Sequence, residues 1–129
     1  MEFQSERRFQ IWDYHISHAR MLIRSPNSSG TSTNQDIIFW GVEFLGIPTS
    51  FRGLTIATVP RDEATRAGAP ADKFGHSTAF RLESEGRCCY IVALACKVFE
   101  NELDLFDSSL DEPWAEQPRT DRGRLLARS

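Results

Sequence analysis

The sequence predicts a mainly β protein, at the margin of the α+β class: a five-stranded antiparallel meander that curls into a half-barrel or a sandwich, with one or two short helices. Two segments carry this prediction, residues 36–45 (DIIFWGVEFL) and residues 87–99 (RCCYIVALACKVF), because nearly every position in them is apolar. Successive side chains point to opposite faces of a strand, so both faces of these two strands are apolar. Each strand must therefore be covered on both sides, by a helix, a second sheet or closure of the sheet.

A helix is the alternative for residues 87–99, since apolar residues from Ile91 to Val98 also fall near one helical stripe. However, β-branched and aromatic residues are frequent in this segment, and residues 84–86 (SEG) give a turn signal just before it. We therefore interpret the segment as a strand around which the sheet is organised.

Three more segments complete the predicted sheet: residues 7–24, 51–59 and 76–83. Each alternates apolar and polar side chains over part of its length, as a half-buried strand does. The first has 18 residues, which is long for one strand. The chain is therefore expected to bend or bulge between Ser17 and Arg20.

Two short helices are predicted, near residues 61–67 and 101–110. Pro60 and Gly68 are typical start and stop residues for the first, and Asn101 is a suitable cap for the second. Each helix is expected to cover an apolar face of the sheet. The second would do so through apolar residues spaced three and four apart, namely Leu103, Phe106 and Leu110.

The chain of 129 residues is expected to form one domain with a sizeable core. We assign residues 1–112 to a single β-rich domain and residues 113–129 to a flexible C-terminal tail. Pro113 and Pro118 interrupt regular structure in the tail, and Trp114 between them is a candidate anchor onto the body.

Charge and hydropathy narrow the classes of partner. The net charge is −3, and residues 100–129 alone hold 8 acidic and 4 basic side chains. The rest of the chain is nearly neutral and has no basic stripe, which argues against nucleic acid as a partner. The amino terminus, MEFQSERRFQ, is too charged for a secretory signal, and no apolar run reaches the roughly 18 residues of a membrane span. These observations predict a cytoplasmic protein without membrane contact.

A polar cluster on the first predicted strand supplies the candidate catalytic residues Asp13, His15 and His18, to which His76 from another strand is added. Asp13 and His15 share one strand face, where a carboxylate and an imidazole can serve one proton or one metal ion. His18 joins them only if a bulge intervenes. Hydrogen-bonded side chains at the rim of a strand are the more ordinary interpretation, so we predict neither a metal ion nor a cofactor.

The three cysteines, Cys88, Cys89 and Cys96, lack the Cys-x-x-Cys spacing of zinc and redox sites and are interpreted as small packing residues. The chain also lacks a Gly-x-Ser-x-Gly motif, a phosphate-binding glycine loop and a paired-histidine helix motif. The sequence therefore favours a role without catalysis, although the absence of a motif does not exclude an enzyme.

The function predicted from these observations is a small cytoplasmic protein-interaction module, with a regulatory or inhibitory role toward another protein. Residues 100–116 contain seven carboxylates and no basic side chain, and Glu102, Asp104 and Asp107 are the expected contact residues. Association into a homo-oligomer is a second way to cover apolar faces. The alternative is an enzyme, or a small-ligand or metal binder, that uses the polar cluster of the first strand.

Overall fold

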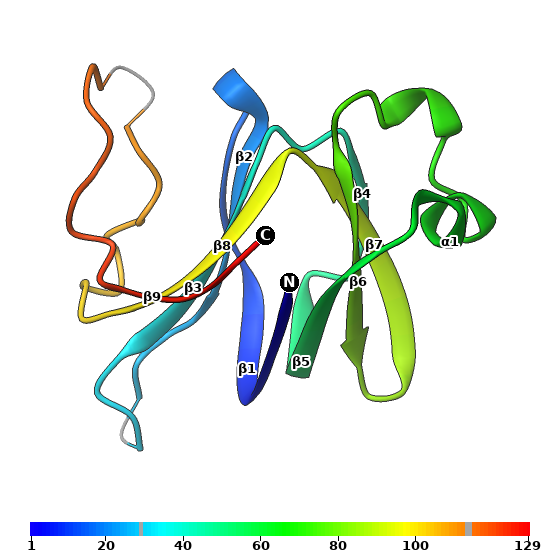
Figure 1. Ribbon diagram of the computed structural model, residues 1–129. Helices are drawn as coiled ribbons and strands as arrows, with labels where there is room; N and C mark the ends of the chain where they lie inside the picture. Colours follow the sequence, from blue (N-terminus) through cyan, green and yellow to red (C-terminus); the bar gives the residue numbers. More distant parts are fainter. Residues whose placement is uncertain (29, 113–114) are drawn as a thin grey trace.

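The computed structural model describes residues 1–28, 30–112 and 115–129 (Figure 1). The described part contains one α-helix, α1 (Arg61–Arg66), and two 3-10 turns, η1 (Ser17–Ala19) and η2 (Ala71–Lys73). The antiparallel strands are β1 (Glu2–His15), β2 (Arg20–Ser25), β3 (Asn34–Trp40), β4 (Phe44–Gly46), β5 (Ser50–Val59), β6 (Thr78–Ser84), β7 (Arg87–Ala93), β8 (Ala95–Asn101) and β9 (Arg124–Arg128). The predicted mainly β, antiparallel class is confirmed, but the sheet has nine strands where the sequence predicted five.

The sheet closes into a ring because the chain bends sharply at two places, between β3 and β4 and between β7 and β8. Strand β4 continues the path of β3, and β8 continues the path of β7. At the corner Leu94 N donates a hydrogen bond to Trp40 O (2.9 Å), and Glu43 N donates one to Val92 O (2.8 Å). Pairing therefore runs in a ring from β1 through β2, β3–β4, β7–β8, β6 and β5 back to β1. The predicted half-barrel is corrected to this closed arrangement, with β9 paired to β8 beside it.

Gly41 makes the corner possible. Its φ of 61° lies in the left-handed region, and a Cβ atom at this position would lie 2.5 Å from Leu94 Cδ1. Leu94 separates β7 from β8, so the predicted strand over residues 87–99 is in fact two strands. Both halves are extended and paired, which excludes the helical alternative for this segment.

The bend predicted in the long first segment is present. Strand β1 ends at His15, β2 begins at Arg20, and η1 lies between them. His18 and Ala19 have positive φ angles of 67° and 45°, which reverse the chain within a few residues. The segment thus supplies two neighbouring strands of the ring.

The main core fills the inside of the ring. Side chains two residues apart on a strand share a face, so Ile37 and Phe39 point inward while Ile38 between them points outward. Phe39 meets Phe80 from the other side of the ring edge to face, with ring centroids 5.4 Å apart. The buried members of this core are Phe9, Met21, Ile23, Ile37, Phe39, Phe51, Leu54, Ile56, Phe80, Leu82, Ile91, Ala93, Cys96 and Val98.

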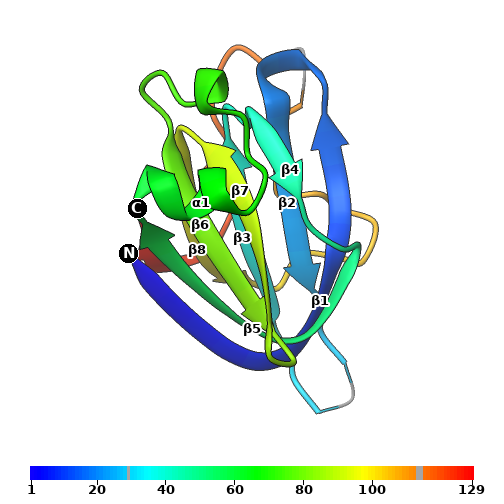
Figure 2. The ribbon, with the colours of Figure 1, turned by 90° about the vertical axis from the view of Figure 1, so that its right-hand side faces the viewer.

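The connection between β5 and β6 covers one outer face of the ring. Figure 2 shows α1 lying in front of β6 and β7. Ala64 and Phe74 of this connection pack against Val92 of β7. Glu63 accepts a hydrogen bond from the Tyr90 hydroxyl (2.9 Å), which fixes the helix to the sheet. The first predicted helix is therefore present as α1, and it covers an apolar face as expected.

The connection between β8 and β9 covers the opposite outer face, on the left of Figure 1. In its described part no helix follows Asn101, which instead ends β8. Leu110 of this connection packs against Leu22 and Ile38, with 1% of its surface exposed. The predicted helix over residues 101–110 is therefore wrong, although the expected cover is provided.

The last residues add strand β9 to the region assigned to a flexible tail. Its residues pair with β8, where Glu100 lies opposite Arg124. The division into a domain of residues 1–112 and a tail stays a prediction, and Trp114, the expected anchor, lies outside the described residues. No helix within the described ranges is long and apolar enough to cross a membrane.

Candidate protein-interaction loop

The histidine cluster is assembled only in part. His15 Nε2 lies 3.1 Å from Asp13 Oδ2, as expected for neighbours on one strand face. His18 is exposed in the turn after β1, and His76 is exposed just before β6. In the part of the chain that the structure describes, no group of three His, Cys, Asp or Glu side chains is arranged to hold a metal ion. Asp13 and His15 therefore form a pair, but neither of the other described histidines completes a three-residue metal site with them.

The acidic loop, residues 102–108, presents the other predicted contact residues. It begins directly after β8 and turns where Asp107 N donates a hydrogen bond to Asp104 O (2.9 Å). The two residues inside this turn are apolar, and Leu105 is 45% exposed while Phe106 is 96% exposed. The tip of the loop therefore offers a phenyl ring to solvent between two aspartates.

A buried polar network holds the start of the loop. Asn34 on β3 donates hydrogen bonds to Asn101 Oδ1 (2.9 Å) and to Leu103 O (2.8 Å). The amide nitrogen of the same side chain, Asn101 Nδ2, donates a hydrogen bond to Asp36 Oδ2 (2.9 Å). Asp36 is fully buried, and its two oxygens also accept hydrogen bonds from Arg24 at 2.6 Å and 2.8 Å. The chain therefore leaves β8 in a direction set by side chains of the sheet.

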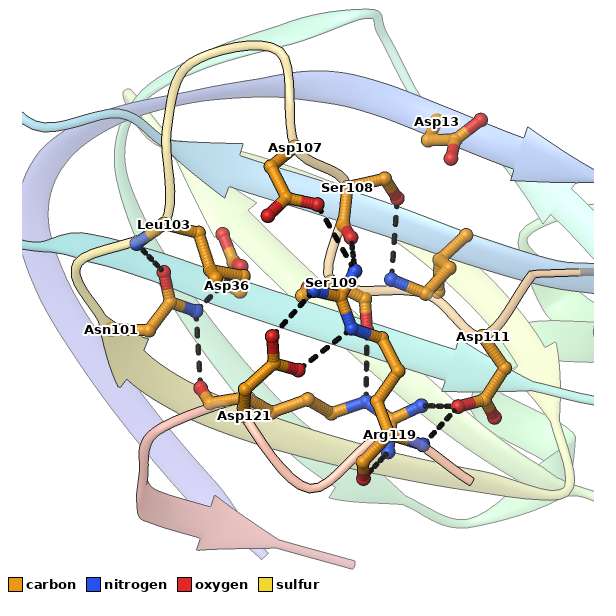
Figure 3. A network of polar contacts seen from close by, with 12 residues as sticks. Asp13, Asp36, Asn101, Leu103, Asp107, Ser108, Ser109, Asp111, Arg119 and Asp121 are labelled. Carbon is orange, nitrogen blue, oxygen red and sulfur yellow. Dashed lines mark hydrogen bonds and ion pairs between the residues drawn. The ribbon is translucent and has the colours of Figure 1, made fainter. Parts of the chain in front are cut away.

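A second set of contacts holds the end of the loop (Figure 3). The Arg119 guanidinium donates to the carbonyl oxygen of Ser108 and lies 3.3 Å from Asp107 Oδ1. Asp121 binds the same guanidinium at 2.7 Å, and this hydrogen bond lowers the pKa of the Asp121 carboxyl group. Asp121 therefore stays ionised at neutral pH and keeps Arg119 in position.

Arg122 continues this clamp toward the sheet. Its guanidinium donates to the carbonyl oxygen of Ser109 (2.9 Å) and to Asp111 Oδ1 (2.7 Å). Asp111 is also bound by Arg20 of β2 (3.1 Å). Hydrogen bonds and ion pairs thus fix residues on both sides of the acidic loop to β2, β3 and β8.

The acidic side chains of the loop differ in their freedom. Asp107 is held by Arg119, whereas Glu102 and Asp104 are exposed and form no ion pair within the described residues. The structure therefore places all three predicted contact residues on one short loop and leaves two of their carboxylates available. Their role in contacting a partner stays a prediction.

Phe106 is the site residue that sequence reasoning missed. Its spacing from Leu110 suggested the buried face of a helix. A second signal was present in the sequence, since Asp104-Leu-Phe-Asp107 begins with an aspartate, a residue that favours the first position of a β-turn. The turn, and not the helical spacing, decides the conformation because both ends of the loop are tied to the sheet.

The cysteines lie apart from the acidic loop and differ in exposure. Cys88 is exposed, Cys89 is half-buried and Cys96 is buried. Burial raises the pKa of Cys89 to about 11 and raises that of Cys96 further. Desolvation, followed by the hydrogen bond with Glu83, raises the pKa of Cys88 to a smaller extent. All three thiols are therefore protonated at neutral pH.

We expect iodoacetamide at pH 8 to modify the three cysteines in the order Cys88, Cys89, Cys96, because reactivity follows thiolate content and access. Peptide mass spectrometry over time would measure each rate, with the protein unfolded in urea as the reference. In the folded protein Cys96 should stay unmodified after Cys88 has reacted completely. Equal rates for Cys88 and Cys96 would contradict the placement of Cys96 inside the ring.

Comparison with known proteins adds no family to these observations. No protein-family model, no curated protein sequence and no solved structure matches the chain. The function must therefore be argued from the site itself.

Proposed function

We propose that this protein is a protein-interaction module that binds another protein through the acidic loop. The exposed ring of Phe106, held at the tip of a loop whose two ends are fixed, is the observation that carries the proposal. The complementary surface on the partner is an apolar pocket bordered by lysine or arginine side chains. A regulatory or inhibitory role and a cytoplasmic location remain parts of the same proposal.

Burial of Phe106 would supply much of the affinity. Transfer of a phenylalanine side chain from water into an apolar pocket contributes about 1.5–3 kcal/mol. Single exposed apolar residues are common on protein surfaces and do not by themselves indicate binding. Here Leu105 extends the apolar tip, and the contacts of Arg119 and Asn101 hold the loop that carries it.

Preorganisation is the second argument. A flexible loop loses conformational entropy when it is ordered on binding, at about 0.5–1.5 kcal/mol for each immobilised side chain. The acidic loop already has its ends fixed by Asn34, Arg119 and Arg122 in the free protein. It therefore loses less entropy on binding than an unanchored loop of the same length.

The carboxylates would guide association and select the partner. Exposed charges act mainly on the association rate and on the exclusion of wrong partners, and salt screens them. Glu102 and Asp104 are available for this role, whereas Asp107 is shared with Arg119. We therefore expect partner binding to weaken as ionic strength rises.

Affinity capture from the native host tests this proposal when three baits are compared: the wild type, Phe106→Ala and Ile16→Ala. Ile16 is the matched control, since it is 90% exposed in a turn outside the acidic loop. A specific partner should be retained by the wild type and by Ile16→Ala and lost with Phe106→Ala. Proteins retained equally by all three baits would contradict a role for the acidic loop.

A further inference from the structure

The outer face of β8 and β9 carries a basic patch, which consists of Lys97, Phe99, Leu125 and Arg128. Cys96 and Val98 of β8 belong to the main core inside the ring. Side chains alternate between the two faces of a strand, so Lys97 and Phe99 point outward. In the β8–β9 pair, Arg128 lies opposite Lys97 and Leu125 lies opposite Phe99. Directly opposite residues share a face, so the four side chains lie on one side of the sheet.

The basic patch combines apolar surface with two cations. Leu125 is 46% exposed, and the neighbouring Phe99 is half-buried against the outer apolar cluster. Lys97 and Arg128 are exposed, and neither forms an ion pair with a carboxylate of the described residues. The patch therefore offers apolar contact area bordered by two positive charges that have no partner within the described chain.

The pairing register makes this arrangement unfavourable in a single copy. Lys97 and Arg128 are directly opposite, and like charges in such positions destabilise an antiparallel pair. A third cation is near, since Lys97 and Arg122 each lie 5.7 Å from the centroid of the Trp40 ring. Arg122 is neutralised by Asp111 at 2.7 Å, whereas the other two cations are not. Carboxylates from a second molecule would remove the repulsion between Lys97 and Arg128.

The acidic loop of this chain has the complementary features. Glu102 and Asp104 are exposed carboxylates without an ion pair in the described structure, and Phe106 presents its ring to solvent between them and Asp107. An exposed phenyl ring matches the apolar part of the basic patch, where it can pack against Leu125. Opposite charges at the rim of a contact guide association and fix its orientation.

Within one copy these two surfaces do not meet. Strands rise about 3.3 Å per residue, so Lys97 lies about 13 Å before Asn101, at which β8 ends and the acidic loop begins. Asn34 holds the start of the loop at that end of the sheet. The connection that contains the loop nevertheless lies on the same outer side as the patch, on the left of Figure 1. One side of the molecule therefore carries both halves of a possible contact.

We propose that the basic patch binds the acidic loop of a second copy of this chain, so that two copies form a symmetric dimer. The inference rests on the proposed function, since it names the partner of the acidic loop. A two-fold axis makes the contact twice, with each loop on the patch of the other copy. Two such contacts are small beside the roughly 1,200 Å² of a stable complex, so the dimer should be weak and sensitive to salt.

Sedimentation equilibrium over a range of protein concentrations tests the proposal. The wild type should show a reversible monomer–dimer equilibrium that salt weakens. A patch variant, Lys97→Glu/Arg128→Glu, and a loop variant, Glu102→Lys/Asp104→Lys, should each dimerise at least about tenfold more weakly. An equimolar mixture of the two variants should restore the dimer, because the loop of each then has the opposite charge to the patch of the other. A mixture that associates no better than either variant alone would overturn the proposal.

Two further variants complete the test. Phe106→Ala should also weaken the dimer at least about tenfold, because it removes the ring that packs on the patch. The matched control is Arg52→Glu/Arg87→Glu, which changes the net charge by the same amount at two exposed arginines of β5 and β7 and should dimerise as the wild type does.

Two results at this interface would contradict the proposal: a wild type that stays monomeric, and a patch variant that dimerises as the wild type does. The patch variant should unfold near the wild-type temperature, because its two replaced positions again carry like charges. A monomeric wild type would overturn the dimer alone. The proposed function would still stand if capture retained another protein with the wild type and lost it with Phe106→Ala.

Discussion

Replacement of Asp36 by alanine should lower the free energy of unfolding by about 3–5 kcal/mol, which is the cost of leaving a buried charge without its partner. Arg24 and Asp36 are both fully buried, and two hydrogen bonds join them. Asn101 would also lose an acceptor, so the start of the acidic loop should loosen. Urea unfolding followed by tryptophan fluorescence measures the change in stability.

The double variant Arg24→Met/Asp36→Leu distinguishes the effect of an unpaired buried charge on stability from the effect of lost side-chain volume. Hydrophobic replacement of a whole buried ion pair is often neutral or stabilising. The double variant should therefore be clearly more stable than Asp36→Ala. If both variants lose the same stability, the packing of this region, and not the unpaired Arg24 charge, is the main cause.

Replacement of Gly123 by alanine is the second change expected to have a large effect. Gly123 has a φ of 90°, and a Cβ atom there would overlap the carbonyl oxygen of Glu100. The left-handed conformation and the overlap together should cost about 3 kcal/mol. The chain can avoid this cost by releasing β9 from β8, which would also displace Arg122 from the clamp of the acidic loop.

Hydrogen exchange would detect this release residue by residue. Amide protons of residues 124–128 should exchange faster in Gly123→Ala, while those of β2 and β3 should keep their protection. Gly30→Ala is the control, since its φ is not in the left-handed region and, among the described residues beyond its chain neighbours, no atom lies within 4 Å of a Cβ atom there. Normal protection of β9 in Gly123→Ala would contradict the predicted overlap.

The sequence predicted that the strands within residues 36–45 and 87–99 are apolar on both faces. It also predicted that other parts of the chain must cover both faces. The bend near Ser17 was predictable because 18 residues exceed the usual length of a strand. Closure of the ring was not, since it depends on the fit of Leu94 beside Gly41, a contact between residues far apart in the chain.

The candidate sites show the same limit. The exposure of Asp104 and Asp107 was predictable from local composition, because an acidic run favours solvent, and their contact role stays a prediction. Phe106 was placed on a helix, since the contacts that fix the loop come from distant residues such as Asn34 and Arg119.

The affinity of the acidic loop for a purified partner tests the central claim most directly. A protein recovered by capture would be titrated with the wild type, with Phe106→Ala and with Glu102→Gln/Asp104→Asn at two salt concentrations. We predict a loss of about 2 kcal/mol, or roughly thirtyfold in affinity, for Phe106→Ala. The charge variant should lose its dependence on salt. Equal affinity of the wild type and Phe106→Ala would contradict the account.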